Sequence, residues 1–357
     1  MKGGPMQILD RNVVNRARRA YSCRRVPLEE IKTLIGAARR PRAGDLVLAR
    51  VGKPGSHKRI ELPSGRRAMM NPGDEIIVAY GDRYAPDQYE AYVPGDLGPC
   101  HLVAAGGIAA RAESWHDRLS GPTEIEPVGL LGCARHEPIN IGDFALKPVP
   151  GPMPEAVFAV FGTSMNAGKT ITAATLIKGF SDAGFRVGAA KITGTAAGGD
   201  PWLMRDYGAA DALDFSDAGL PSTFNVDPET ILQGAKNMLY ALAAHGCSVA
   251  VIEVADGLYQ KETAVLAGMD DLRSMLTGTF FAAGDAMGAV SGVRDLVCNG
   301  HRVLGISGAL TRSPLGSREA AEASGLPVFA LSDLTDPEAI ADWAALAGGR
   351  FAAVAGQ

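Results

Sequence analysis

The chain has 357 residues, 46% hydrophobic and 21% charged, which excludes intrinsic disorder or a collagen-like fibre and allows about two domains. Its net charge of −4 gives no overall basic surface, so nucleic acid is not expected as a partner. The five cysteines are dispersed without a CxxC pair and no apolar run reaches about 18 residues, so we expect a reducing, cytoplasmic location and no membrane span.

Residues 1–43 carry a marked excess of positive charge. The acidic residues there are Asp10, Glu29 and Glu30, and the basic ones are Lys2, Arg11, Arg16, Arg18, Arg19, Arg24, Arg25, Lys32, Arg39, Arg40 and Arg42. This segment is either a basic arm for an anionic partner or a solvated helical face and tail. A helix is predicted from Pro27, a residue suited to its first turn, with an apolar stripe formed by Leu28, Ile31, Leu34 and Ile35.

Residues 44–147 have the pattern of a small β-rich domain. Short apolar segments alternate with turn signals such as Asn71-Pro72-Gly73-Asp74. The predicted strands are 45–51, 57–62, 75–80, 89–93 and 102–110. This spacing favours a barrel-like or sandwich domain. Four prolines within 148–154 then predict a stiff linker, because proline fits neither a helix interior nor a central strand.

Residues 155–357 alternate strands and helices. The predicted strands are 156–161, 187–192, 249–254, 279–283, 303–307 and 328–331. The predicted helices lie near 170–183, 229–244, 285–299, 317–324 and 336–347. Continuous apolar strands alternating with helices indicate an α/β fold, a doubly wound and mostly parallel sheet with ligands beyond the carboxyl ends of its strands.

A glycine-rich loop between the first of these strands and its helix is typical of a phosphate-binding P-loop. It runs Gly162-Thr163-Ser164-Met165-Asn166-Ala167-Gly168-Lys169-Thr170. Backbone N–H groups of 164–170 would cradle phosphate oxygens at the helix N-terminus. Lys169, expected to be exposed to this site, would reach the β- and γ-phosphates, and the Thr170 hydroxyl would hold Mg²⁺.

The loop is one residue longer than the usual P-loop and resembles that of dethiobiotin synthetase and its relatives, over about residues 155–335. Those loops begin Gly-Thr-Asp, whereas this chain has Ser164 in place of the aspartate. The resemblance implies ATP and Mg²⁺ as cofactors. The loop is also similar to that of a family that includes a D-glutamate N-acetyltransferase, where it would serve an acyl-CoA phosphate.

The second strand of this pattern ends in Lys191. The resemblance implies a lysine that helps to bind the substrate and the transferring phosphate, although Ile192 replaces the proline that follows in the relatives. A snorkelling lysine at a strand end is the alternative. The resemblance also implies an aspartate ligand for Mg²⁺ further on, with Asp200 and Asp206 as the candidates. Asp200 could instead cap a short helix that begins at Pro201.

The apolar strand 248–254 contains Glu253 and is followed by Asp256 and Gly257, a Walker B-like arrangement. An unpaired carboxylate within an apolar run would be costly, so we expect Glu253 to bind Mg²⁺, directly or through water. Asp256 would orient a nucleophile or the metal. The polar stretch 214–223 is a possible substrate wall on the same rim.

Together these features predict an ATP- and Mg²⁺-dependent enzyme of ligase or kinase type. It would transfer the γ-phosphoryl group to a small-molecule acceptor, or activate a carboxylate of it, with Lys169 and Lys191 neutralising charge. The alternatives are an N-acyltransferase that uses acyl-CoA and a nucleotide-gated binding or chaperone module. A homo-oligomer is expected.

Overall fold

The computed structural model describes residues 7–36 and 39–347, so Lys2 of the predicted basic arm lies outside the described residues. The chain forms two compact units. The first contains the described residues up to Leu146 together with 195–199 and 215–225, and the second contains the remainder. The two added segments fall within 155–357, which the sequence analysis treated as one domain.

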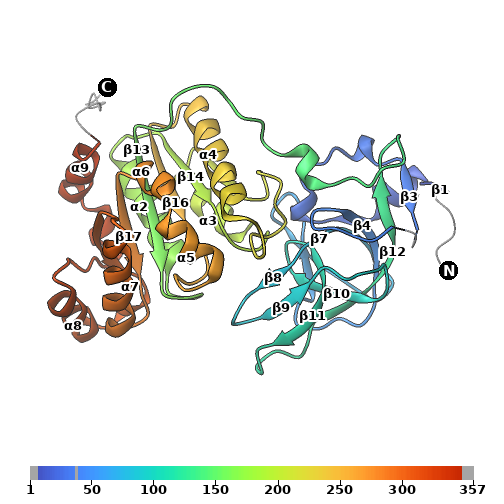
Figure 1. Ribbon diagram of the computed structural model, residues 1–357, viewed down its shortest axis with the longest axis horizontal. Helices are drawn as coiled ribbons and strands as arrows, with labels where there is room; N and C mark the ends of the chain where they lie inside the picture. Colours follow the sequence, from blue (N-terminus) through green and yellow to red (C-terminus); the bar gives the residue numbers. More distant parts are fainter. Residues whose placement is uncertain (1–6, 37–38, 348–357) are drawn as a thin grey trace. The chain divides into compact units, whose positions relative to one another are not determined.

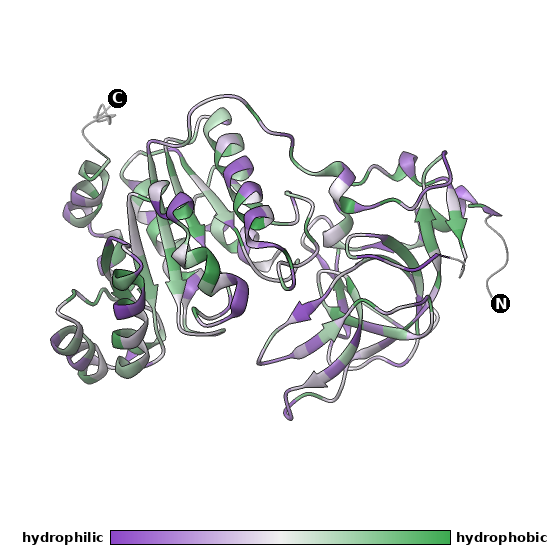
Figure 2. Cartoon of the chain, viewed as in Figure 1, coloured by the Kyte–Doolittle hydropathy of each residue, from purple (hydrophilic) through white to green (hydrophobic). Residues whose placement is uncertain are grey.

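The second unit is built on a parallel sheet of six strands, in the order β15-β14-β16-β13-β17-β18 (Figure 1). The strands are β13 (Ala156–Gly162), β14 (Val187–Lys191), β15 (Asp211–Asp214), β16 (Val249–Glu253), β17 (Gly278–Ala282) and β18 (Val303–Ser307). The predicted α/β class with a parallel sheet is confirmed. Figure 2 colours most of these strands white to green, as expected for a sheet buried on both faces.

Helices cover both faces of this sheet. One face packs its core against α2 (Lys169–Asp182) and α9 (Pro337–Ala345) through side chains such as Phe158, Phe180 and Trp343. The opposite face meets α4 (Pro228–Ala244) and α7 (Ala286–Cys298), where Leu242 lies against Gly188 and Phe281 against Gly292. The other helices are α3 (Gly199–Asp206), α5 (Lys261–Gly268), α6 (Asp270–Ser274) and α8 (Pro314–Ser324).

Several details of the second unit differ from the sequence prediction, among them the unpredicted helices α5 and α6. Residues 328–331 form no strand, because only Val328 makes an isolated bridge, to Ile306. Strand β15 was not predicted, since its apolar centre is only two residues long. Asp200 does not cap α3, because the helix already begins at Gly199.

In the described part of the chain, no helix has the length and apolar character that crossing a bilayer requires.

The first unit consists mainly of strands. Its main sheet follows the order β1-β3-β12-β4-β7-β11-β9-β8, with β10 between β11 and β12 and β2 beside β7. These strands are β1 (Gln7–Ile8), β2 (Arg18–Arg19), β3 (Thr33–Ile35), β4 (Leu46–Val51), β7 (Glu75–Tyr80), β8 (Arg83–Tyr84), β9 (Tyr89–Tyr92), β10 (Cys100–Ala104), β11 (Ile108–Trp115) and β12 (Thr123–Gly132). A separate hairpin pairs β5 (Arg59–Glu61) with β6 (Arg67–Met69).

Both faces of the central strands are buried. Along β4, Val47 and Ala49 enter one core cluster, while Leu46 and Leu48 enter the other. This two-sided burial explains the unbroken apolar runs in this part of the sequence.

The helix predicted from Pro27 is wrong. Residues Leu28–Glu30 form a single 3₁₀ turn, and 33–35 form β3, in which Leu34 pairs with Leu131 of β12. Pairing within the sheet buries Leu34 and Ile35 and overrides the helical spacing of the apolar residues. The helix in this region is instead α1 (Arg11–Arg16), capped by Asp10. The strand predicted at 102–110 is two strands, because a turn at 105–107 separates β10 from β11.

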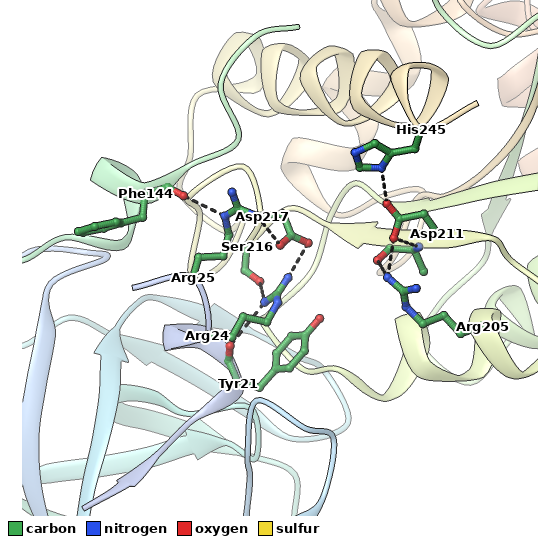
Figure 3. A network of polar contacts seen from close by, with 10 residues as sticks. Tyr21, Arg24, Arg25, Phe144, Arg205, Asp211, Ser216, Asp217 and His245 are labelled. Carbon is green, nitrogen blue, oxygen red and sulfur yellow. Dashed lines mark hydrogen bonds and ion pairs between the residues drawn. The ribbon is translucent and has the colours of Figure 1, made fainter. Parts of the chain in front are cut away.

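Polar contacts hold the segment 215–225 within the first unit. Arg24 donates to the Ser216 hydroxyl at 2.6 Å and forms an ion pair with Asp217 at 2.5 Å (Figure 3). Arg25 donates to the carbonyl of Phe144 at 2.9 Å and lies 3.5 Å from Asp217. The other segment, 195–199, is held by Glu61, which accepts the backbone N–H of Gly198 at 3.0 Å.

Candidate functional site

The loop between β13 and α2 has the backbone form of a phosphate-binding loop. Asn166 and Gly168 both have positive φ, 63° and 98°, which turns the chain sharply before the first residue of α2. A Cβ at Gly168 would lie 2.9 Å from Cα of Gly308, and one at Gly308 would lie 2.3 Å from the carbonyl oxygen of Ala167. Ala309 donates its N–H to the same carbonyl at 2.9 Å. The loop is therefore braced against the end of β18.

Lys169 is the first residue of α2 and folds back over this loop. Its ammonium donates to the carbonyl of Ser164 at 2.7 Å, and only 5% of the residue is exposed. The expectation of an exposed lysine is therefore wrong, because the side chain folds inward and the loop's own carbonyl binds its ammonium. Burial lowers the pKa of Lys169, and the nearby carboxylates of Glu253 and Asp256 oppose that shift.

Thr170 and Glu253 contact each other directly. The Thr170 hydroxyl donates to Oε1 of Glu253 at 3.1 Å. Glu253 is 2% exposed, and within the described chain its Oε2 atom is buried without a hydrogen-bond partner. Burial raises the pKa of Glu253; the charge of Asp200 raises it further, whereas Lys191 and Lys169 lower it. A buried carboxylate oxygen without a hydrogen-bond partner, beside a hydroxyl, is an oxygen donor that could bind a divalent cation.

Three neighbouring strands end on charged residues that stand in register. Lys191 of β14 pairs with Glu253 of β16 on one side and with Asp214 of β15 on the other. Lys191 also forms an ion pair with Asp200. Burial lowers the pKa of Lys191, but the charges of Asp200 and Glu253 outweigh it, and the net shift is upward. The lysine therefore stays charged among carboxylates at the carboxyl edge of the sheet.

The structure separates the two aspartates that the sequence left as alternatives. Asp200 lies in the first turn of α3, and its carboxylate reaches Lys191. Asp206 is the last residue of the same helix and is exposed. Six residues of helix put it about 9 Å further along the axis, so Asp206 is not brought to the site. The preceding Arg205 binds Asp211, which also contacts His245 (Figure 3).

The loop after β16 packs against the start of the P-loop. Leu258 donates its N–H to the carbonyl of Gly162 at 3.0 Å, and a Cβ at Gly257 would lie 2.5 Å from the carbonyl oxygen of Thr163. Asp256 has a positive φ of 62°, rare for a residue with a side chain. The charge of Asp256 lies close enough to Lys169 to oppose the lowering of the lysine's pKa by burial. Ser164 and Asn166 are exposed in this loop, and Met165 is half-buried.

Across the described ranges, no group of three or more His, Cys, Asp or Glu side chains is arranged as a metal cage. The available donors are the Thr170 hydroxyl and the Glu253 carboxylate. This small set fits Mg²⁺, which keeps several waters and takes further oxygens from substrate phosphates.

No family model and no curated protein matches the sequence. Among solved structures, the 54 kDa signal recognition particle protein from Aeropyrum pernix, in complex with GDP, is 16% identical, with a TM-score of 0.39 over 58% of this chain and 49% of that one. The match therefore spans about half of that protein. The signal recognition particle receptor FtsY from Elizabethkingia anophelis is 15% identical, with a TM-score of 0.36 over 59% of this chain and 75% of that one. The cell division protein FtsY from Thermotoga maritima is 20% identical, with a TM-score of 0.36 over 57% of this chain and 72% of that one. Likenesses this low indicate nothing about shared activity.

Two contributors to the site were not assigned from the sequence. Asp214 was seen only as part of a possible substrate wall, and its register with Lys191 follows from the unpredicted strand β15. Gly308, just after β18, was given no role, whereas its lack of a side chain lets this segment approach the P-loop. A strand that ends in aspartate was a usable signal for Asp214, but nothing local to Gly308 marked its contact.

Proposed function

We propose that the second unit binds ATP with Mg²⁺ and transfers the γ-phosphoryl group to a small-molecule acceptor, either as a kinase or to activate a carboxylate for ligation. The observation that carries this proposal is the pair formed by Thr170 and Glu253, with one carboxylate oxygen buried and unpartnered directly beside a glycine-braced loop. A metal held there would neutralise charge on the β- and γ-phosphates.

Each site residue then has a distinct role. The backbone N–H groups of 164–170 bind phosphate oxygens at the N-terminus of α2. Lys169 exchanges the carbonyl of Ser164 for a phosphate oxygen. Lys191 faces the acceptor or the transferring group, with Asp200 fixing its position. Asp256 orients the attacking group.

Phosphoryl transfer would run from ATP to a deprotonated oxygen of the acceptor, such as a carboxylate oxygen. That oxygen would attack the γ-phosphorus while the bond to the β–γ bridging oxygen breaks and ADP leaves. Mg²⁺ and Lys191 would together offset the negative charge of the acceptor and of the neighbouring carboxylates.

The test is nucleotide titration of the full chain by calorimetry, together with Mg²⁺-dependent ADP formation. Lys169→Ala should lower ATP affinity about 10²-fold or more while the melting temperature stays nearly unchanged. Lys178→Ala is the matched control, because Lys178 lies on the same helix, is exposed and pairs with the exposed Asp182. Full ATP affinity in Lys169→Ala contradicts the proposal.

Mass spectrometry of the ligand retained by the purified protein separates this function from acyl transfer. Retained ATP or ADP supports phosphoryl transfer. Retained acyl-CoA, with no ATP affinity in titration, would instead favour an N-acyltransferase.

A further inference from the structure

The backbone carbonyl of Ala255 accepts hydrogen bonds from two buried threonines. Thr193, which follows β14, donates its hydroxyl at 3.1 Å, and Thr263 of α5 donates its own at 3.3 Å. Both threonines are 1% exposed. A carbonyl oxygen has two lone pairs, and here side chains from two different elements occupy both. These contacts fix the peptide bond that joins Ala255 to Asp256.

This peptide bond leads into a residue with an unusual backbone conformation. The φ of Asp256 is 62°, a left-handed value that a residue with a side chain adopts only at a cost in free energy. Such a conformation persists where the surroundings hold it, and it is common at functional sites. On the other side of Asp256, Gly257 packs against the P-loop, because a Cβ there would lie 2.5 Å from the carbonyl oxygen of Thr163. The chain is therefore held both before and after Asp256.

Asp256 lies within electrostatic reach of both lysines of the site. Burial lowers the pKa of Lys169, and the charge of Asp256 is one of those that oppose this shift. At Lys191 burial acts in the same direction, but neighbouring carboxylates that include Asp256 give a net upward shift of the pKa. A small rotation of the backbone at Asp256 would therefore move a carboxylate relative to two ammonium groups.

Thr263 is itself anchored to the loop that contains Asp256. Its backbone N–H donates to the side-chain oxygen of Gln260, the residue that caps α5, at 2.9 Å. Gln260 in turn donates its backbone N–H to the carbonyl of Gly257 at 3.0 Å. The start of α5 and the loop are thus closed on each other, which places the Thr263 hydroxyl against the carbonyl of Ala255.

Thr193 is anchored to the strand that carries Lys191. The residue between them, Ile192, donates its backbone N–H to the carbonyl of Glu253 at 3.0 Å, so the chain leaving β14 remains paired with the end of β16. The hydroxyl of Thr193 continues this pairing by one more contact, to Ala255. The position of Asp256 is therefore linked to the strand end that bears Lys191.

We propose that Thr193 and Thr263 are positioning residues for phosphoryl transfer, and that their hydroxyls hold Asp256 in its left-handed conformation beside the lysines of the site. The inference rests on the proposed function, in which Asp256 orients the attacking group. If the hydroxyls served only to satisfy a buried carbonyl, their loss would lower stability and leave Asp256 in place.

The conformation of Asp256 can be measured without any turnover. Thr193→Val and Thr263→Val keep the shape of each side chain and remove its donor, alone and together. The NMR chemical shifts of Cα and Cβ of Asp256 report its backbone conformation, and we expect them to move away from left-handed values, most in the double variant. Each single variant keeps one donor and serves if the double variant does not fold. Shifts equal to those of the parent in every folded variant would overturn the proposal.

Turnover tests whether the two hydroxyls act through Asp256. Each valine variant should lower kcat for Mg²⁺-dependent ADP formation about tenfold, while metal-free ATP affinity stays within about twofold. Thr193→Ser and Thr263→Ser keep the donor and should restore most of kcat. In an Asp256→Asn background, either valine substitution should cost less than about a further twofold, because the carboxylate that it positions is already absent.

Thr175→Val is the matched control for these variants. The buried Thr175 hydroxyl donates to the carbonyl of Ile171 within α2 at 2.7 Å, so its loss should leave kcat within about twofold. Fully additive losses from Thr193→Val and Asp256→Asn would overturn the positioning role. If the parent protein forms no ADP, the proposed function fails by itself, and the chemical shifts of Asp256 then decide whether the threonines position it.

Discussion

Lys191 and Glu253 end neighbouring parallel strands in register, so that a half-buried cationic group and a buried carboxyl group stand side by side at the carboxyl edge of one sheet. They are not a simple ion pair, because the lysine reaches Asp200 and the carboxylate accepts from Thr170. Each charge thus has a partner, while one oxygen of Glu253 keeps none.

Glu253→Gln should separate stability from activity. Removing a buried negative charge relieves a desolvation cost, so the ligand-free variant should melt at the same temperature as the parent or higher. Mg²⁺-dependent turnover should fall about 10²-fold or more, with a much smaller change in metal-free nucleotide affinity. Thermal denaturation and turnover at several Mg²⁺ concentrations measure both effects. A destabilised variant with normal metal dependence would assign Glu253 a structural role.

Asp200→Asn and Asp206→Asn should differ sharply. The first removes the ion-pair partner of Lys191 and should lower kcat about tenfold or more. The second changes an exposed residue at the end of α3 and should leave kcat within about twofold. Steady-state kinetics on the two purified variants decide between them. An equal loss in both would mean that α3 moves during the reaction.

Much of this site follows from local sequence. The P-loop, Glu253 and Lys191 each stand at the end of an apolar strand, and the topology of a parallel sheet brings such ends to one edge. The sequence alone could not decide between Asp200 and Asp206, because the decision depends on where α3 begins. The position of the Lys169 ammonium depends on its hydrogen bond to the carbonyl of Ser164, which no feature of the sequence indicates.

The first unit was harder to predict. Leu34 and Ile35 have a spacing that suits a helix as well as a strand, and only the distant β12 decides the outcome. Segments 195–199 and 215–225 carry no signal that they belong to the earlier part of the chain, since their partners, such as Glu61 and Arg24, are far away in the sequence.

Glu61→Ala should destabilise the first unit. Glu61 is 1% exposed and accepts the N–H of Gly198, so its removal leaves a buried donor unpaired at a cost of about 1–3 kcal/mol. Glu61→Gln keeps an acceptor and should lose less. Urea denaturation measures the difference, with the exposed Glu126→Ala as control. Equal losses in Glu61→Ala and Glu126→Ala would show that the Gly198 contact contributes nothing.

Acid should weaken the protein in part through His57. Burial first, and then the charge of Arg83, lower the pKa of His57 to about 4, whereas an unfolded histidine titrates near 6.5. The unfolded chain therefore takes up the proton first, and this contribution to stability is lost as pH falls from about 6.5 to about 4. His57→Gln should show a shallower loss across that range in urea denaturation, while the difference between the two proteins stays constant above about pH 7.5. Parallel profiles at all pH values would contradict the prediction.

The segments of 195–225 that complete the first unit affect how the chain can be synthesised and cut. Ala196 and Phe215 are fully buried in a cluster with Val103 and Ile108, so a ribosome that has released residue 146 has not yet released all of that core. At about 5–20 residues per second, the missing pieces emerge roughly 4–16 s later. During that interval the apolar side chains of this cluster, such as Val103 and Ile108, lack the residues that bury them. A chain truncated at the proline-rich linker would leave these apolar side chains without the residues that bury them.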